Sequence, residues 1–150
     1  GFKNIVLAEH SCGAWQSLAL NGKFPEKIKA TIGTNPACRG HISDRTKNDR
    51  PSWNAYDEYE VNKYFINPSS EINALLFIND KDPYENSETL HFFLNKNKIK
   101  IINYTNFKCK NKFGANAHAF PVYPKNDNCF AQWENKNQYI INYLKEVFKS

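Results

Sequence analysis

Four short apolar runs, separated by segments of helical or loop character, set the possible folds of this chain. The runs cover about residues 3–10, 28–33, 74–78 and 99–103, and helices are expected at about 14–20, 54–65, 87–95 and 130–148. Strands that alternate with helices predict an α/β fold: a mostly parallel sheet, joined by right-handed crossovers, with helices on both faces. In such sheets, functional side chains gather where the strands end.

Length and composition indicate one domain. The 150 residues are 41% hydrophobic, which is enough for a sizeable core, and the chain has no internal repeat or low-complexity linker. No apolar run approaches the roughly 20 residues of a membrane span, so none is expected. The net charge of +5 is spread along the chain, and its densest basic stretch, residues 108–112, is interpreted as a solvated loop. We therefore expect no nucleic-acid partner.

The four cysteines show no C-x-x-C spacing. A metal site, dithiol redox chemistry and a cofactor are therefore not expected. Cys109 and Cys129 flank a loop around residue 118 and could form a disulfide, which would indicate a periplasmic or secreted protein. The alternative is a cytoplasmic protein with free thiols, and the sequence leaves the localisation open. The thiol of Cys12 is expected to be buried and inert.

The first apolar run breaks abruptly into Ser11-Cys12-Gly13, ahead of a helix-like segment. A serine hydroxyl becomes a good nucleophile when a sharp strand-to-helix turn exposes it beside an imidazole and oxyanion-binding N–H groups. The pattern therefore predicts a nucleophile elbow with Ser11 at its tip and the Cys12 backbone N–H as an oxyanion donor. An ordinary strand-to-helix turn remains the alternative for this motif alone.

An acid and a base for such a serine follow in the order nucleophile, acid, histidine. Asp82 comes just after the apolar run 74–78, where Pro83 favours an extended backbone that projects the carboxylate from the strand end. Asp80 is the competing acid, and it could instead cap the loop. His118 lies in a small-residue loop after the run 99–103, as a general base requires. Structural roles are expected for the other three histidines, with His10 pointing away from the site; they are His10, His41 and His91.

Several of these segments together resemble the C-terminal half of an α/β-hydrolase, on the dienelactone hydrolase-like branch. The resemblance covers nearly all of the chain and is carried by the elbow and by residues 23–32, 35–37, 75–83 and 116–120. It implies a serine hydrolase with Ser11, His118 and Asp82 as a catalytic triad. Such an enzyme cleaves an ester, lactone or related small acyl substrate through an acyl-enzyme. Residues 38–70 occupy the place of a cap-like insertion, in which Trp53 and Tyr56 could line the substrate pocket.

Two departures from that family favour an alternative. Glu9 stands where the family usually has the first glycine of Gly-x-Ser-x-Gly. The family's fold also has about four strands before the nucleophile strand, whereas only two residues precede Lys3 in this sequence. We therefore expect the chain to be part of a longer domain, with the edge of its first strand covered by an N-terminal remainder or by an oligomer partner. The alternative function is that of a non-catalytic or truncated hydrolase-like fragment, or an interaction module.

Overall fold

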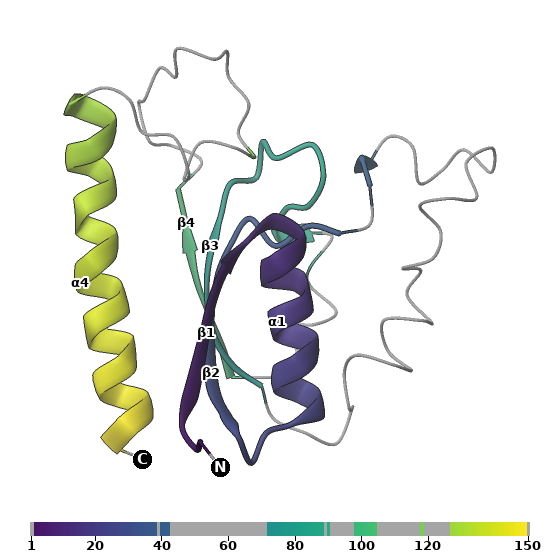
Figure 1. Cartoon of the computed structure of the whole chain (residues 1–150). Helices are drawn as coiled ribbons and strands as arrows, with labels where there is room; N and C mark the ends of the chain where they lie inside the picture. Colours follow the sequence, from purple (N-terminus) through teal and green to yellow (C-terminus); the bar gives the residue numbers. More distant parts are fainter. Residues whose placement is uncertain are drawn as a thin grey trace.

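The computed structural model describes residues 2–38, 40–42, 72–88, 90, 98–104, 118 and 127–149, with the side chains of the last helix from Lys136 onward. Four parallel strands form one sheet, in the spatial order β1 (Ile5–His10), β2 (Ile28–Thr34), β3 (Asn73–Ile78) and β4 (Lys98–Asn103). Helix α1 (Ser11–Lys23) covers one face, and helix α4 (Asp127–Lys149) covers the other (Figure 1). The predicted α/β class, with a parallel sheet between helices, is confirmed.

Strand β3 forms the centre of the core. It is buried on both faces, as expected for an inner strand of a parallel sheet. Ala74, Leu76 and Ile78 pack on the α1 side with Trp15 and Leu18. On the α4 side, the alternate residues of β3 pack with residues of β2 and α4; this second cluster contains Ala30, Ile32, Leu75, Phe77, Tyr104, Tyr143 and Val147. Because successive side chains of a strand point to opposite faces, β3 contributes residues to both clusters.

Helix α4 contacts the sheet through one apolar stripe. Tyr143 and Val147 are buried, and Ile140 and Leu144 are partly buried against the same cluster. These positions repeat at the spacing of one helix face. The helix expected at 130–148 is therefore present and packs on the sheet, although it begins at Asp127, three residues before its expected start.

Helix α1 packs very closely on β2. An ideal Cβ at Gly33 would lie 3.3 Å from the Cβ of Ala14 and 2.7 Å from Cδ2 of Leu76, so a side chain at this position would require Leu76 to shift. At the far end of the helix, the buried Asn21 amide donates to Thr31 Oγ1 at 3.1 Å and to the Asn73 carbonyl at 3.0 Å. This polar network ties α1 to β2 and β3 at the end of the sheet away from Ser11.

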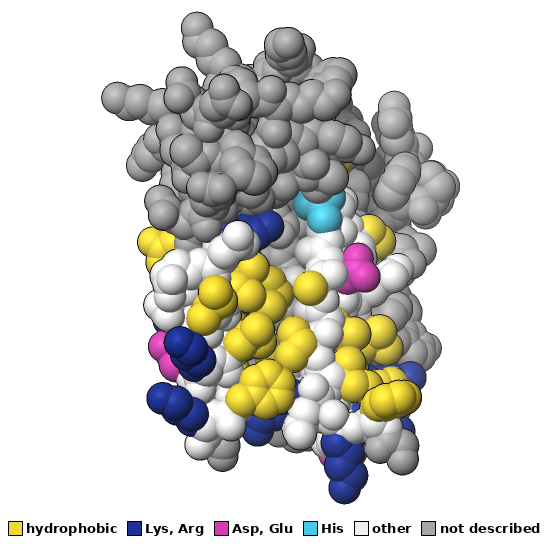
Figure 2. Space-filling view, turned by 60° about the vertical axis from the view of Figure 1, so that its left-hand side comes forward, with side chains coloured by type: hydrophobic (Ala, Val, Ile, Leu, Met, Phe, Trp, Pro, Cys, Tyr) yellow, Lys and Arg dark blue, Asp and Glu magenta, His cyan; other side chains and the backbone are white. Residues whose placement is uncertain are grey.

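Strand β1 lies at one edge of the sheet and, among the described strands, pairs only with β2. Figure 2 shows apolar side chains gathered on one face of the molecule, with a histidine at the upper border of the described surface. Large exposed apolar side chains occur near both ends of the chain and in α1; they are Phe2, Leu20, Tyr139, Ile141 and Phe148. Within the described ranges, no helix has both the length and the hydropathy of a membrane span.

Helix α1 runs from Ser11 to Lys23 rather than over the expected residues 14–20, because the turn at Ser11 leads directly into the helix. Ser87, Glu88 and Leu90 are helical, in agreement with the start of the helix expected at 87–95. The remainder of that helix, the expected helix at 54–65 and residues 43–70 of the expected insertion lie outside the described residues.

Candidate active site

Ser11 occupies a strained turn between β1 and α1. His10 is still extended, with φ −121° and ψ 151°, whereas Ser11 has a φ of 55°. A positive φ in a non-glycine residue costs roughly 1–3 kcal/mol, and such strained residues cluster at functional sites. The predicted elbow is therefore present in the backbone, with Ser11 as the first residue of the helix.

His118 lies between the predicted nucleophile and the predicted acid. Its Nε2 is 2.7 Å from Oγ of Ser11, and its Nδ1 is 2.7 Å from Oδ2 of Asp82. An ionised carboxylate only accepts hydrogen bonds, so Nδ1 carries the proton and Nε2 accepts from the serine hydroxyl. This arrangement allows His118 to take the proton of Ser11, although 107 and 36 residues separate it from its two partners.

Asp82, not Asp80, contacts the histidine. The carboxylate of Asp82 is buried, and its Oδ1 accepts a hydrogen bond from the backbone N–H of Tyr84 at 2.8 Å. Asp80 instead accepts hydrogen bonds from the backbone and side chain of Ser87 and from the amide of Asn103. Burial raises the pKa of Asp80, but these hydrogen bonds outweigh it and lower the pKa overall. The alternative capping role considered for Asp80 is therefore the one that its contacts support.

Cys12 lies in the first turn of α1, where backbone N–H groups have no partner within the helix. Its N–H could therefore donate to an oxyanion beside Ser11. The expectation for its side chain was wrong: Cys12 is not an inert thiol but forms a disulfide with Cys38. The Ala37 N–H also donates to the Ser11 carbonyl at 3.1 Å, and the Ser11 hydroxyl lies 3.5 Å from the Ala37 carbonyl, so the segment after β2 is joined to the elbow by three links.

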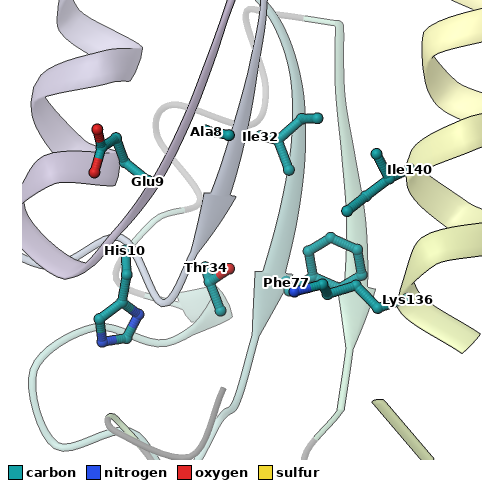
Figure 3. Close-up of a pocket in the computed structure, with 8 residues that line it drawn as sticks. All are labelled: Ala8, Glu9, His10, Ile32, Thr34, Phe77, Lys136 and Ile140. Atoms are coloured by element: carbon teal, nitrogen blue, oxygen red, sulfur yellow. The ribbon is translucent and has the colours of Figure 1, made fainter. Parts of the chain in front are cut away.

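Glu9 fits at the elbow because Gly13 makes room for it. An ideal Cβ at Gly13 would lie 3.3 Å from Cβ of Glu9 and 3.0 Å from its Oε2. In Figure 3 the Glu9 side chain points toward α1, away from the other residues that line the pocket. Because Gly13 has no side chain, it leaves space for the side chain of Glu9. No such space is needed when the first position of the motif is itself a glycine.

Two aromatic rings flank the His118 imidazole. The ring of Tyr84 has its centroid 4.7 Å away, and the ring of His10 has its centroid 5.0 Å away. His41 in turn packs edge-on against Tyr84 at 5.5 Å. The expectation that His10 points away from the site was wrong, since the strand end turns its side chain toward the His118 loop.

Burial lowers the pKa of His10, and the neighbouring His118 lowers it further. A hydrogen bond with the Thr34 backbone and the charge of Asp82 act in the opposite direction but do not reverse the shift. Within the described part of the chain, Nδ1 of His10 is buried and has no hydrogen-bond partner. His10 is therefore neutral near neutral pH, beside an imidazole that must become positively charged if Ser11 is activated.

A pocket of about 380 Å³ opens between the carboxyl ends of β1–β3 and helix α4 (Figure 3). Ile32 and Phe77 form its apolar floor, and Lys136 and Ile140 reach into it from α4. Burial lowers the pKa of Lys136. His10 lines the end of this pocket next to His118, so the space adjoins the Ser11 site.

Sequence patterns did not reveal Asn35, which bonds to the backbone carbonyl of His118 at 2.9 Å. The available signal was its place at the end of a strand, before Pro36.

Several predictions fall outside the described residues: those for Trp53 and Tyr56, for His91, and for a bridge between Cys109 and Cys129. No cluster of three or more metal-ligating side chains occurs in the ranges that the structure describes.

Comparisons of the chain with protein-family models, with curated proteins and with solved structures found no match. The function is therefore inferred from the geometry and chemistry of the site.

Proposed function

We propose that this chain is the C-terminal part of an α/β-hydrolase-like domain and acts as a serine hydrolase on an ester, lactone or related acyl substrate. One observation carries the proposal: two hydrogen bonds of 2.7 Å join Ser11, His118 and Asp82 in an unbroken line. The three residues follow three different strands in the sequence, β1, β3 and β4, in the order that the sequence resemblance implies. A strained serine at a strand-to-helix turn supports the same conclusion.

In the first half of the reaction, Oγ of Ser11 attacks the acyl carbon while Nε2 of His118 removes its proton. The carbonyl oxygen becomes an oxyanion, which accepts a hydrogen bond from the Cys12 N–H at the positive end of the helix α1 dipole. The buried carboxylate of Asp82 keeps the imidazole in the Nδ1–H tautomer and stabilises its positive charge. The tetrahedral intermediate then collapses, and His118 gives its proton to the leaving oxygen.

The second half repeats these steps with water. The acyl group is now held as an ester on Ser11, and His118 removes a proton from a water molecule that attacks this ester. Collapse of the second tetrahedral intermediate breaks the bond to Oγ, and His118 returns the proton to Ser11. The net reaction consumes one water and releases the acid and the alcohol, so it requires no cofactor.

The substrate pocket is proposed to involve the cap-like segment 38–70, with Trp53 and Tyr56 against the acyl or leaving group. The described pocket beside His10 adds an apolar wall with a lysine on it, which suits a small substrate with an apolar body. An N-terminal remainder of the domain, or an oligomer partner, is proposed to cover the edge of β1 that pairs with none of the described strands.

A non-catalytic role, as a hydrolase-like fragment or interaction module, is the second candidate. The half-exposed strand β1 favours it, because among the described strands β1 pairs on one side only, and an unpaired strand edge is a natural docking surface for another chain. This candidate predicts normal folding and no turnover, whereas the enzyme requires turnover that depends on Ser11.

Hydrolysis of p-nitrophenyl esters of increasing acyl length separates the two candidates. The enzyme is expected to show a pre-steady-state burst of p-nitrophenol, because acylation precedes hydrolysis of the acyl-enzyme. Ser11→Ala should lose the burst and at least about 10³-fold in kcat, while Ser17→Ala, a buried serine in the same helix, should retain both. Turnover that is equal in wild type and Ser11→Ala would refute the triad.

A further inference from the structure

Asn35 is buried at the carboxyl ends of β2, β3 and β4, next to His118, with only 1% of its surface exposed. We propose that Asn35 is a positioning residue that holds the His118 backbone so that its imidazole can reach Ser11 and Asp82 together. This inference rests on the proposed serine hydrolase function and deepens it. It assigns a role to a side chain that touches neither the substrate nor the reacting atoms.

The hydrogen bonds of the Asn35 amide fix its orientation. Its Oδ1 accepts from the backbone N–H of Asn79 at 3.2 Å, and its Nδ2 donates to the backbone carbonyl of His118 at 2.9 Å. A backbone N–H can only donate and a carbonyl can only accept, so the oxygen and nitrogen cannot be exchanged. The amide therefore bridges the end of β3 and the His118 loop in one defined direction.

The Asn35 backbone is anchored as firmly as its side chain. Its N–H donates to the Phe77 carbonyl at 2.8 Å, which continues the ladder between β2 and β3 by one residue. Its φ is 42°, a conformation that asparagine, aspartate and glycine tolerate better than other residues. The residue type thus satisfies both the backbone turn and the bridge.

Tyr104 supports the amide from β4. A side-chain hydrogen bond joins its hydroxyl to Asn35, and the backbone N–H of Tyr104 donates to the Ile78 carbonyl at 2.9 Å. Burial raises the pKa of Tyr104, so its hydroxyl stays neutral. Three neighbouring strands therefore contribute to the site that holds the His118 carbonyl.

The consequence for His118 follows from geometry. Its ring is fixed by hydrogen bonds at both nitrogens, and the Asn35 bond adds a third anchor, on the backbone. An imidazole that must serve two partners at 2.7 Å tolerates little displacement, and a shift of about 1 Å can cost on the order of 10²-fold in rate. Loss of the third anchor should therefore slow proton transfer while leaving substrate binding unchanged.

The variant Asn35→Asp tests this role. Aspartate keeps the size, the tolerance for positive φ and the acceptor for the Asn79 N–H. When it is ionised, its second oxygen faces the His118 carbonyl and cannot donate to it, so the variant is compared with the wild type at a pH where this carboxyl is ionised. We expect kcat for p-nitrophenyl acetate to fall about 10- to 100-fold with KM nearly unchanged. The matched control is Asn21→Asp, which alters a second buried asparagine at the opposite end of the sheet. It should lower stability without changing kcat.

A second readout does not depend on activity. The Nδ1 proton shared by His118 and Asp82 should give a low-field proton NMR resonance in the wild type and in Asn21→Asp, and the resonance should be lost or broadened in Asn35→Asp. If the aspartate variant does not fold, Asn35→Gly removes the side chain and keeps the positive φ, with the same expected loss. Tyr104→Phe, which leaves the His118 bond intact, should keep the resonance.

The two proposals fail in different ways. A wild type that shows the resonance but hydrolyses no ester would refute the serine hydrolase and leave the positioning role open to the NMR test. An Asn35 variant that folds and keeps the wild-type resonance and kcat would overturn the positioning role alone. Absence of the resonance from the wild type would overturn it as well, because no fixed imidazole would exist to be positioned.

Discussion

Glu9 and Gly13 share one space at the turn between β1 and α1: a Cβ on Gly13 would lie 3.3 Å from Cβ of Glu9. Alanine is favoured over glycine in a helix by roughly 1 kcal/mol, but here the added methyl group meets Glu9. Gly13→Ala alone is therefore expected to change the free energy of unfolding little. In a Glu9→Gly background the same substitution should stabilise the protein by about 1 kcal/mol. Urea denaturation of the four proteins measures the difference, and equal effects in both backgrounds would show that the two residues do not compete.

Asp82 and Asp80 are expected to respond differently to the same change. Asp82→Asn removes the charge that stabilises the imidazolium and favours the wrong tautomer, so kcat should fall about 10³- to 10⁴-fold with the fold retained. Asp80→Asn weakens hydrogen bonds to Ser87 and Asn103 and should cost about 1 kcal/mol of stability, with kcat within about twofold of wild type. Ester hydrolysis and urea denaturation test the pair. A larger loss of kcat in the Asp80 variant would reverse the assignment.

Removal of the disulfide between Cys12 and Cys38 should destabilise the protein. The linked residues are 26 positions apart, and closing a loop of that size stabilises a fold by roughly 3–4 kcal/mol in the chain-entropy description. Thermal melting with and without a reductant measures this, with the double variant Cys12→Ser, Cys38→Ser as the control that a reductant should not affect. Wild-type melting that is indifferent to the reductant would contradict the bond.

The stability of the protein should fall in mildly acidic solution because of His10. Its pKa in the folded state lies below 6.5, the ordinary value, so protonation favours the unfolded state. The stability that neutral His10 contributes is therefore fully present above pH 6.5. It is lost as the pH falls from 6.5 toward the lower pKa that His10 has in the folded state. His10→Gln should make the free energy of unfolding less dependent on pH between about 7 and 5. An unchanged slope in that variant would assign the effect to other groups.

The architecture and the three site residues could be predicted because each depends on a local pattern. The apolar runs predict the strands, and Ser11, Asp82 and His118 each follow one of them. The Cys12–Cys38 bond could not be predicted, since nothing in the spacing of four cysteines shows that the loop after β2 returns to the elbow. Asn35 was missed for a related reason: its role depends on three strand ends meeting, and a single asparagine carries no periodic signal. The fit of Glu9 beside Gly13 was missed because it depends on the sharp turn at Ser11, which brings the two residues together.

Covalent labelling by a fluorophosphonate, with the modified residue mapped by mass spectrometry of the peptides, tests the central claim most directly. The wild-type chain should gain one adduct, on Ser11, because among the hydroxyls that the structure describes, that of Ser11 has an imidazole at 2.7 Å positioned to remove its proton. Ser11→Ala should gain none while it folds as the wild type does, and His118→Ala should react far more slowly. Labelling of Ser11→Ala at the wild-type rate would contradict the account.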